Sequence, residues 1–143
     1  MMGRAVLGKA DMDHYDFLRW KVTDGIATVW LSRPPVNAVN QAMYREIKAL
    51  FTDPGMLSGA KVVVLTGQGR HFCAGNDVGE FATLRPENAD ERMAEVRAAF
   101  FAIQDCPVPV VAAVHGAALG TGLAIAASCD FVLAADDARL GTP

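Results

Sequence analysis

The stretch that decides the fold runs from Val108 to Asp130 and reads VPVVAAVHGAALGTGLAIAASCD. Residues 108–114 form a continuous apolar run rich in valine, which predicts a buried strand. A glycine-rich turn follows at 116–122, where the chain must bend sharply and where another backbone or a ligand can come close. From about residue 120 to 127 the sequence is apolar on every side, which predicts a short helix inside the core.

The start of this helix is the first candidate site. The first N–H groups of a helix have no partner within it and carry a partial positive charge. Here they lie near Thr121, where they would suit a group that gains negative charge during a reaction. The glycine pattern therefore predicts the centre of an active site at this turn.

Three other interpretations of this stretch stay open. A membrane span is one, because no charged residue lies between Asp105 and Asp130, although two prolines and a histidine argue against it. A nucleotide-binding loop is another, but the run from Gly120 lacks the third glycine and any Gly-Lys-Ser/Thr that would complete it. A purely structural strand and helix is the third, and the stretch taken alone favours it.

Length and composition indicate one globular domain. The chain has 143 residues, 52% hydrophobic and 20% charged, with a formal net charge of −3, which is enough to bury a sizeable core. It has no run of Lys and Arg, which disfavours nucleic acid as a partner. The three widely spaced cysteines predict reduced thiols in the cytoplasm rather than disulfides or a metal site. We expect a flexible tail at 1–14 and one domain at 15–143.

Outside the central stretch, strands alternate with helices. Asp24 and Gly25 form a hairpin turn signal between two alternating runs. The expected strands are 17–23, 26–31, 62–65 and 131–134, and the expected helices are 41–51 and 87–104. A long loop with several glycines, 66–77, follows the third strand. This order predicts an α/β fold with right-handed crossovers.

Four short motifs follow one another along the chain. They are RPPVNA at 33–38, LTGQGRHFCAGND at 65–77, AAVHGAALGTG at 112–122, and CD at 129–130 with ARLGTP at 138–143. In this order and spacing they resemble the enoyl-CoA hydratase/isomerase family, whose members are also called crotonases. The match covers about residues 17–143, and the four motifs together are much more specific than any one of them.

The resemblance implies a crotonase-like (ClpP/crotonase) spiral of β-β-α turns that acts on an acyl-CoA thioester. In this family two backbone N–H groups form an oxyanion hole, which binds the thioester oxygen as it becomes an enolate. The matching positions here are Asn76 in the long loop and Thr121 in the glycine turn, which we expect to be the catalytic pair. A preorganised donor of this kind is typically worth roughly 3–4 kcal/mol of barrier.

The resemblance also implies where coenzyme A lies. The expected contacts are Val36, Ala74, Asn76, Asp77, Val78, Gly79, Gly120 and Thr121. Many relatives carry Lys where this chain has Gly79, so one phosphate contact is missing, and Arg33 and Arg70 are candidates to replace it. Asp77 is expected to brace its own loop rather than to act as an acid. No metal or separate cofactor is implied, because coenzyme A is part of the substrate.

Two departures from the family pattern bear on the chemistry. The glutamate that hydratases carry on the central helix falls at Ala124, which cannot move a proton, and the second family glutamate would directly follow Pro143. A positioned acid–base group is commonly worth about 10²–10⁴ in rate. We therefore expect a single-base isomerase or another thioester-enolate reaction rather than ordinary hydration.

The missing second glutamate also suggests that the sequence is the N-terminal half of a longer protein, truncated at its C-terminus. The resemblance implies a lyase or isomerase of fatty-acid metabolism, with no membrane partner, that forms a homotrimer or hexamer at full length. The alternative function is a non-catalytic acyl-CoA-binding module or an inactive fragment.

Overall fold

The computed structural model describes residues 14–143, so the tail expected at 1–14 lies almost wholly outside the described residues. The strands are β1 (Leu18–Thr23), β2 (Ile26–Leu31), β3 (Val62–Gly67), β4 (Val110–Val114), β5 (Ala117–Leu119), β6 (Phe131–Ala134) and β7 (Arg139–Gly141). The helices are α2 (Gln41–Thr52), the 3₁₀ helix η1 (Val78–Thr83), α3 (Pro86–Gln104) and α4 (Thr121–Ala127). The main sheet has the order β1-β2-β3-β4-β6, and β5 pairs with β7 in a second, smaller sheet.

The hairpin that opens the domain forms as predicted. β1 and β2 are antiparallel, with Thr23 opposite Ile26 across the turn. Asp24 and Gly25 both have positive φ, 52° and 79°, as a two-residue hairpin turn that matches the strand twist requires. The remaining neighbours in the main sheet are parallel, and a helix connects each parallel pair. The predicted α/β fold is therefore confirmed.

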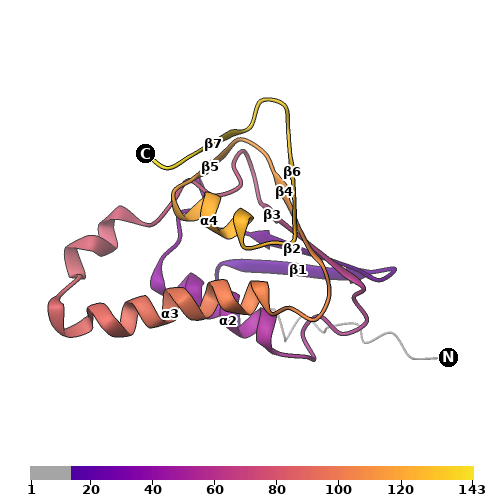
Figure 1. Ribbon diagram of the computed structural model, residues 1–143, viewed down its shortest axis with the longest axis horizontal. Coiled ribbons are helices and arrows are strands. Elements are labelled where there is room, and N and C mark those ends of the chain that lie inside the picture. Colours follow the sequence, from indigo (N-terminus) through magenta and orange to yellow (C-terminus); the bar gives the residue numbers. More distant parts are fainter. Residues whose placement is uncertain (1–13) are drawn as a thin grey trace.

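Helices α2 and α3 lie side by side along the sheet, whereas α4 lies beside the small sheet (Figure 1). The buried side chains of α2 recur at helical spacing and are Met43, Tyr44, Ile47, Leu50 and Phe51. They pack with the inward-facing residues of β1, β2 and β3 in one hydrophobic core. The helical spacing in the sequence predicted this core face correctly.

The end of the described chain is more exposed than the sequence suggests. Helix α4, expected to be buried on every side, is buried only along Gly122, Ile125 and Ala126, whereas Ala124 and Ala127 are exposed. All four residues of β6 are exposed as well. The reason is that α4 packs on one side only, against β5, β6 and the loop at Cys73, and nothing among residues 14–143 covers its other side.

The central stretch does not form one long helix. It folds into β4, β5 and the seven-residue α4, so the membrane-span interpretation of this stretch is wrong. Within residues 14–143 no helix is both long and apolar enough to cross a bilayer. β4 begins at Val110, two residues later than expected, because Pro109 has no N–H for the ladder and contributes only its carbonyl, which accepts from the Val63 N–H at 2.9 Å.

Candidate functional site

The loop after β3 and the turn before α4 lie against each other through their backbones. The Cys73 N–H donates to the Ala117 carbonyl at 3.0 Å, and the Leu119 N–H donates to the Cys73 carbonyl at 3.0 Å. A side chain at Gly122 would collide with that Cys73 carbonyl, so α4 can approach this closely only with glycine there. Gly75 lies next to the Leu119 carbonyl at ordinary contact distance, and its φ of +125°, a conformation that side chains rarely adopt, is what favours glycine there. Gly75 and Gly122, from two different motifs, therefore both lie where the loop after β3 meets the turn before α4.

The same loop pairs on its other side with the segment before α2. The Val39 N–H donates to the Gly75 carbonyl and the Asp77 N–H donates to the Val39 carbonyl, both at 2.9 Å. In such a parallel bridge the residue between them, Asn76, turns its own N–H away from Val39. Among residues 14–143, neither the Asn76 N–H nor the Thr121 N–H has a recorded acceptor.

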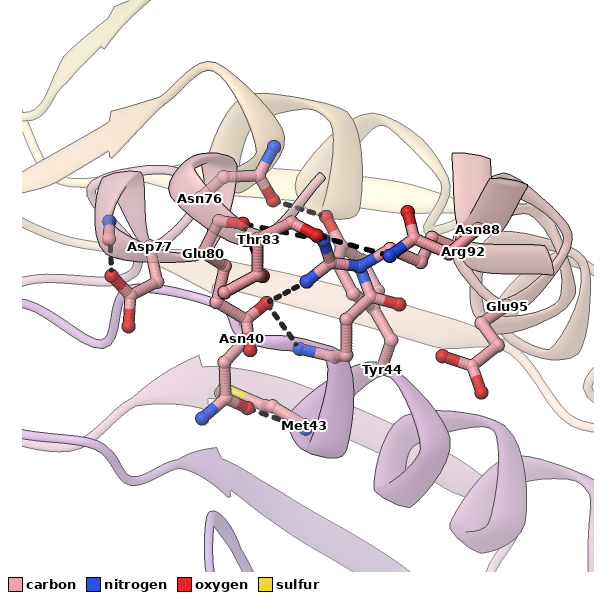
Figure 2. A network of polar contacts seen from close by, with 12 residues as sticks. Asn40, Met43, Tyr44, Asn76, Asp77, Glu80, Thr83, Asn88, Arg92 and Glu95 are labelled. Atoms are coloured by element: carbon pink, nitrogen blue, oxygen red, sulfur yellow. Dashed lines mark hydrogen bonds and ion pairs between the residues drawn. The ribbon is translucent and has the colours of Figure 1, made fainter. Parts of the chain in front are cut away.

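Tyr44 links the two residues that the sequence singled out. Its hydroxyl oxygen is 2.6 Å from Asn76 Oδ1 and 3.2 Å from Thr121 Oγ1 (Figure 2 shows the first contact). Burial raises the pKa of Tyr44 above its ordinary value, and the hydrogen bond with Thr121 opposes this only in part. Tyr44 therefore stays protonated at neutral pH and holds the side chains of Asn76 and Thr121 within reach of one group.

Asp77 braces its loop, as the sequence predicted. Its carboxylate accepts from the Arg33 guanidinium at 2.7 Å and from the Gly79 N–H at 2.9 Å. The hydrogen bond from Arg33 holds the pKa of Asp77 below its ordinary value, with the Gly79 N–H assisting. Arg33 also donates to the Ala38 carbonyl at 2.8 Å. Arg33 is thus engaged within the protein, which leaves the exposed Arg70 as the freer of the two candidates for a phosphate.

Asn37 is a structural residue of the site that the sequence did not single out. It is 1% exposed and has a φ of 55°, a conformation that few residues other than glycine and asparagine adopt. Its amide nitrogen donates to the carbonyls of Gln68 and His71 at 3.0 and 2.9 Å, and its Oδ1 accepts from the Arg33 N–H at 2.9 Å. Asn37 thereby ties the first motif to the second.

A cavity of about 90 Å³ opens beside Asn76. Its lining residues are Val39, Gln41, Tyr44, Asn76, Asp77, Glu80, Phe81, Leu84, Arg92, Met93 and Val96. Asp77 and Glu80 are the carboxylates among them. Glu80 accepts from the Gln41 N–H at 2.9 Å and faces Arg92 at 3.7 Å (Figure 2). Both carboxylates are therefore engaged with protein groups.

A second, larger groove of about 650 Å³ lies between α2 and α3. Its lining residues are Arg45, Lys48, Ala49, Glu91, Ala94, Glu95 and Ala98. None of them belongs to the loops that carry Asn76 and Thr121, and the Arg45–Glu95 ion pair crosses it at 2.8 Å. We therefore take the smaller cavity, and not the larger groove, as part of the candidate site.

The other residues expected at coenzyme A lie on the same connected loops. The Ala74 N–H donates to the Val36 carbonyl at 3.0 Å, which joins the first two positions. Val78 and Gly79 open η1, and Val78 is 78% exposed. Gly120 directly precedes α4 with a φ of +54°.

Ala124, at the position of the hydratase glutamate, is an exposed alanine on α4. It presents only a methyl group to solvent. Cys73, in the loop at 66–77, carries a thiol that could act as a nucleophile. Burial raises the pKa of this thiol to about 11. That thiol is protonated at neutral pH and is a poor nucleophile.

Solved structures share this arrangement of sheet, loops and helices. The chain superposes on an enoyl-CoA hydratase/carnithine racemase from Magnetospirillum magneticum with a TM-score of 0.81 and 35% identity, covering 90% of this chain and 50% of that one. It superposes on an enoyl-CoA hydratase from Thermoplasma volcanium GSS1 with a TM-score of 0.83 and 28% identity, covering 92% and 53%. Fold and site together define a protein of the crotonase-fold class.

Sequence comparison gives the family. The family model described as enoyl-CoA hydratase/isomerase matches residues 21–143. A protein of Rhodobacter capsulatus named "Probable enoyl-CoA hydratase" is 39% identical over 87% of this chain and 48% of its own length. The chain belongs to the enoyl-CoA hydratase/isomerase family, as the four motifs predicted, and it spans about half the length of the relatives it matches.

Proposed function

We propose that the protein binds an acyl-CoA thioester and stabilises its enolate through the backbone N–H groups of Asn76 and Thr121. The observation that carries the proposal is the contact of one hydroxyl, that of Tyr44, with the side chains of both residues. Neither backbone N–H group has a protein acceptor among residues 14–143, which supports their assignment to one acyl oxygen. Donors arranged in advance stabilise a developing oxyanion without the reorganisation that water would need.

The proposal places coenzyme A along the connected loops of the site. Val36 and Ala74 would lie along the CoA moiety, with Asp77, Val78 and Gly79 beside it and Gly120 next to the acyl oxygen. A crotonase-fold neighbour from Thermobifida fusca YX, 26% identical, is described in complex with acetoacetyl-CoA. By analogy, coenzyme A enters as part of the substrate and no separate cofactor takes part.

The chemistry that fits these residues is enolate formation without hydration. Ala124 cannot exchange a proton, and Asp77 and Glu80 are engaged in hydrogen bonds to backbone N–H groups. Adding water across a double bond requires a positioned acid and base. An isomerase that uses one base, or another thioester-enolate reaction of fatty-acid metabolism, therefore fits better.

Assembly and location follow from the family and stay part of the proposal. We expect the full-length protein to form a homotrimer or a hexamer. A reducing compartment, the cytoplasm, fits the three free cysteines, two of which have thiol pKa values raised to about 11 and about 12, chiefly by burial.

The test compares two variants that both lose the Thr121 hydroxyl and that differ in the backbone N–H of residue 121. Thr121 is the first residue of α4, a position where proline is well tolerated because its missing N–H has no partner in the helix. We expect Thr121→Pro to slow exchange of the acyl α-proton by about 10²–10³-fold. Thr121→Ala keeps the N–H and should be slowed much less.

Both variants are made in the full-length protein, which would supply the base that removes the α-proton, and are compared with its wild type by proton exchange into acyl-CoA in deuterated water, with circular dichroism to verify the fold. Equal exchange rates in the two variants would remove the oxyanion role of Thr121. Acyl-CoA binding by calorimetry without any exchange in the wild type would favour the alternative, a non-catalytic binding module.

A further inference from the structure

Tyr44 has an unusual position for a core residue. Its side chain belongs to the buried face of α2 and is 1% exposed, and its ring meets that of Phe100 edge-on at 6.2 Å. A buried tyrosine needs a hydrogen-bond partner for its hydroxyl. Tyr44 finds two, and both are the residues whose backbone N–H groups we assign to the acyl oxygen.

The direction of the two hydrogen bonds follows from the number of protons. The Tyr44 hydroxyl has one proton and Asn76 Oδ1 can only accept, so the 2.6 Å contact is donated by Tyr44. The Thr121 hydroxyl, 3.2 Å away, then donates to Tyr44. With Oδ1 held by Tyr44, the amide nitrogen of Asn76 is turned away from the phenol (Figure 2). The orientation of the Asn76 side chain is thus fixed from within the core.

Backbone contacts bring the two segments together, but they do not orient the side chains of Asn76 and Thr121. The backbone hydrogen bonds between the two loops join Cys73 with Ala117 and Leu119, and they stop before either Asn76 or Thr121 is reached. Within residues 14–143, Tyr44 is the side chain that hydrogen-bonds to both. A residue of α2, an element that contributes no donor of its own, thus links the two donor residues through their side chains.

We propose that Tyr44 is a positioning residue of the acyl-CoA site, which sets the spacing of Asn76 and Thr121 through its hydroxyl. The proposal rests on the proposed function for its catalytic consequence. It goes beyond that function because it assigns a role to a third residue, on a helix that carries neither donor. Because the ring packs in the core and the hydroxyl alone reaches the site, the two contributions can be separated by Tyr44→Phe.

The first experiment is a mutant cycle read out by exchange of the acyl α-proton. We expect Tyr44→Phe to slow exchange at saturating acyl-CoA about five- to tenfold, the loss of one well-placed hydrogen bond, while the dissociation constant changes less than about twofold. The same substitution is then made with both partners already removed by Asn76→Ala and Thr121→Val, which keep their backbone N–H groups. There it should change the rate less than about twofold, because groups that act through each other are not additive.

The second experiment does not depend on activity. The order parameter of the Asn76 side-chain NH₂ group, from ¹⁵N relaxation, should fall in Tyr44→Phe because its fixed acceptor contact is lost. Tyr15→Phe is the matched control: Tyr15 is the only other tyrosine of the chain, and it packs on Trp20 at 4.8 Å. Tyr15→Phe should leave both the order parameter and the exchange rate unchanged.

The outcomes separate the two proposals. If Tyr44→Phe slows exchange equally in the wild type and in the Asn76→Ala, Thr121→Val background, Tyr44 is not a positioning residue. An unchanged order parameter of the Asn76 side chain would also overturn this role. If the wild-type protein neither binds acyl-CoA nor exchanges the proton, the proposed function fails. The order parameter then decides alone whether Tyr44 positions Asn76.

Discussion

The first N–H groups of α2 have side-chain acceptors, whereas those of α4 have none among the described residues. At α2, the Asn40 side chain accepts from the Met43 N–H at 2.8 Å, and the Glu80 carboxylate accepts from the Gln41 N–H at 2.9 Å. At α4, the preceding residue is Gly120, which has no side chain to accept from Thr121 or its neighbours. Polar side chains thus satisfy the free N–H groups at the start of α2, and they are absent at the start of α4, where we place a ligand.

The two helices also differ in how much of their surface the described chain covers. α2 buries a complete face against the sheet and α3, whereas α4 leaves Ala124 and Ala127 exposed. The comparison suggests that α2, apart from the Tyr44 hydroxyl, serves the stability of the domain, whereas α4 belongs to the site. Four substitutions test this division, and they are taken from the largest expected effect to the smallest.

The largest effect is expected in the covered face of α2. Leu50 is 0% exposed, so Leu50→Ala should lower the free energy of unfolding by about 2–5 kcal/mol through lost burial and a residual cavity. Ala127→Ser, on the exposed face of α4, should stay within about 0.5 kcal/mol of the wild type. Urea unfolding followed by circular dichroism measures both. Similar losses in the two variants would contradict the division.

The next largest loss of stability is expected for Gly122→Ala, although helix propensity alone would predict a gain. Alanine favours a helix over glycine by about 1 kcal/mol, yet a Cβ at Gly122 would collide with the Cys73 carbonyl. We expect Gly122→Ala to lower the free energy of unfolding by about 1–3 kcal/mol, as over-packing usually does. The control is Ala127→Gly, whose side chain is exposed and where propensity alone should act. A stabilised Gly122→Ala would mean that the loop after β3 can move away from α4.

The cap of α2 should matter less. Asn40→Ala removes the side chain that accepts from the Met43 N–H, and this should cost about 0.5–2 kcal/mol. Asn40→Asp keeps an acceptor oxygen and should recover most of that loss. The comparison is made by urea unfolding at neutral pH, and no recovery in Asn40→Asp would assign the loss to something other than capping.

These elements differ in how far the sequence could predict them. The hairpin at Asp24 and Gly25 and the buried face of α2 were predicted, because local turn chemistry and helical periodicity determine both. The hydrogen bonds of the Tyr44 hydroxyl could not be predicted. Helical periodicity places Tyr44 in the core, but its two partners lie on loops that are distant in the sequence. Asn37 was quoted within a motif but its burial and positive φ depend on the loops it ties together.

The smallest effect is expected at Asp77, whose ion pair with Arg33 lies partly in solvent, with side chains 27% and 28% exposed. The hydrogen bond from Arg33 lowers the pKa of Asp77 below its ordinary value. A carboxylate whose pKa is lowered by folding stabilises the protein above its unfolded pKa, and this contribution is lost as the pH falls through the folded pKa. Wild type should therefore be modestly more stable than Asp77→Asn at neutral pH.

That difference should shrink as the pH falls below about 4, where wild-type Asp77 in the unfolded chain is already protonated. The measurement is the urea midpoint of both proteins from neutral pH to about pH 3. Asn removes the charge of Asp77 but keeps an oxygen that can accept from the Gly79 N–H. A gap that stays constant over this range would assign the effect to the shape of the loop. A gap that closes shows that the charge of Asp77, paired with Arg33, stabilises the folded chain.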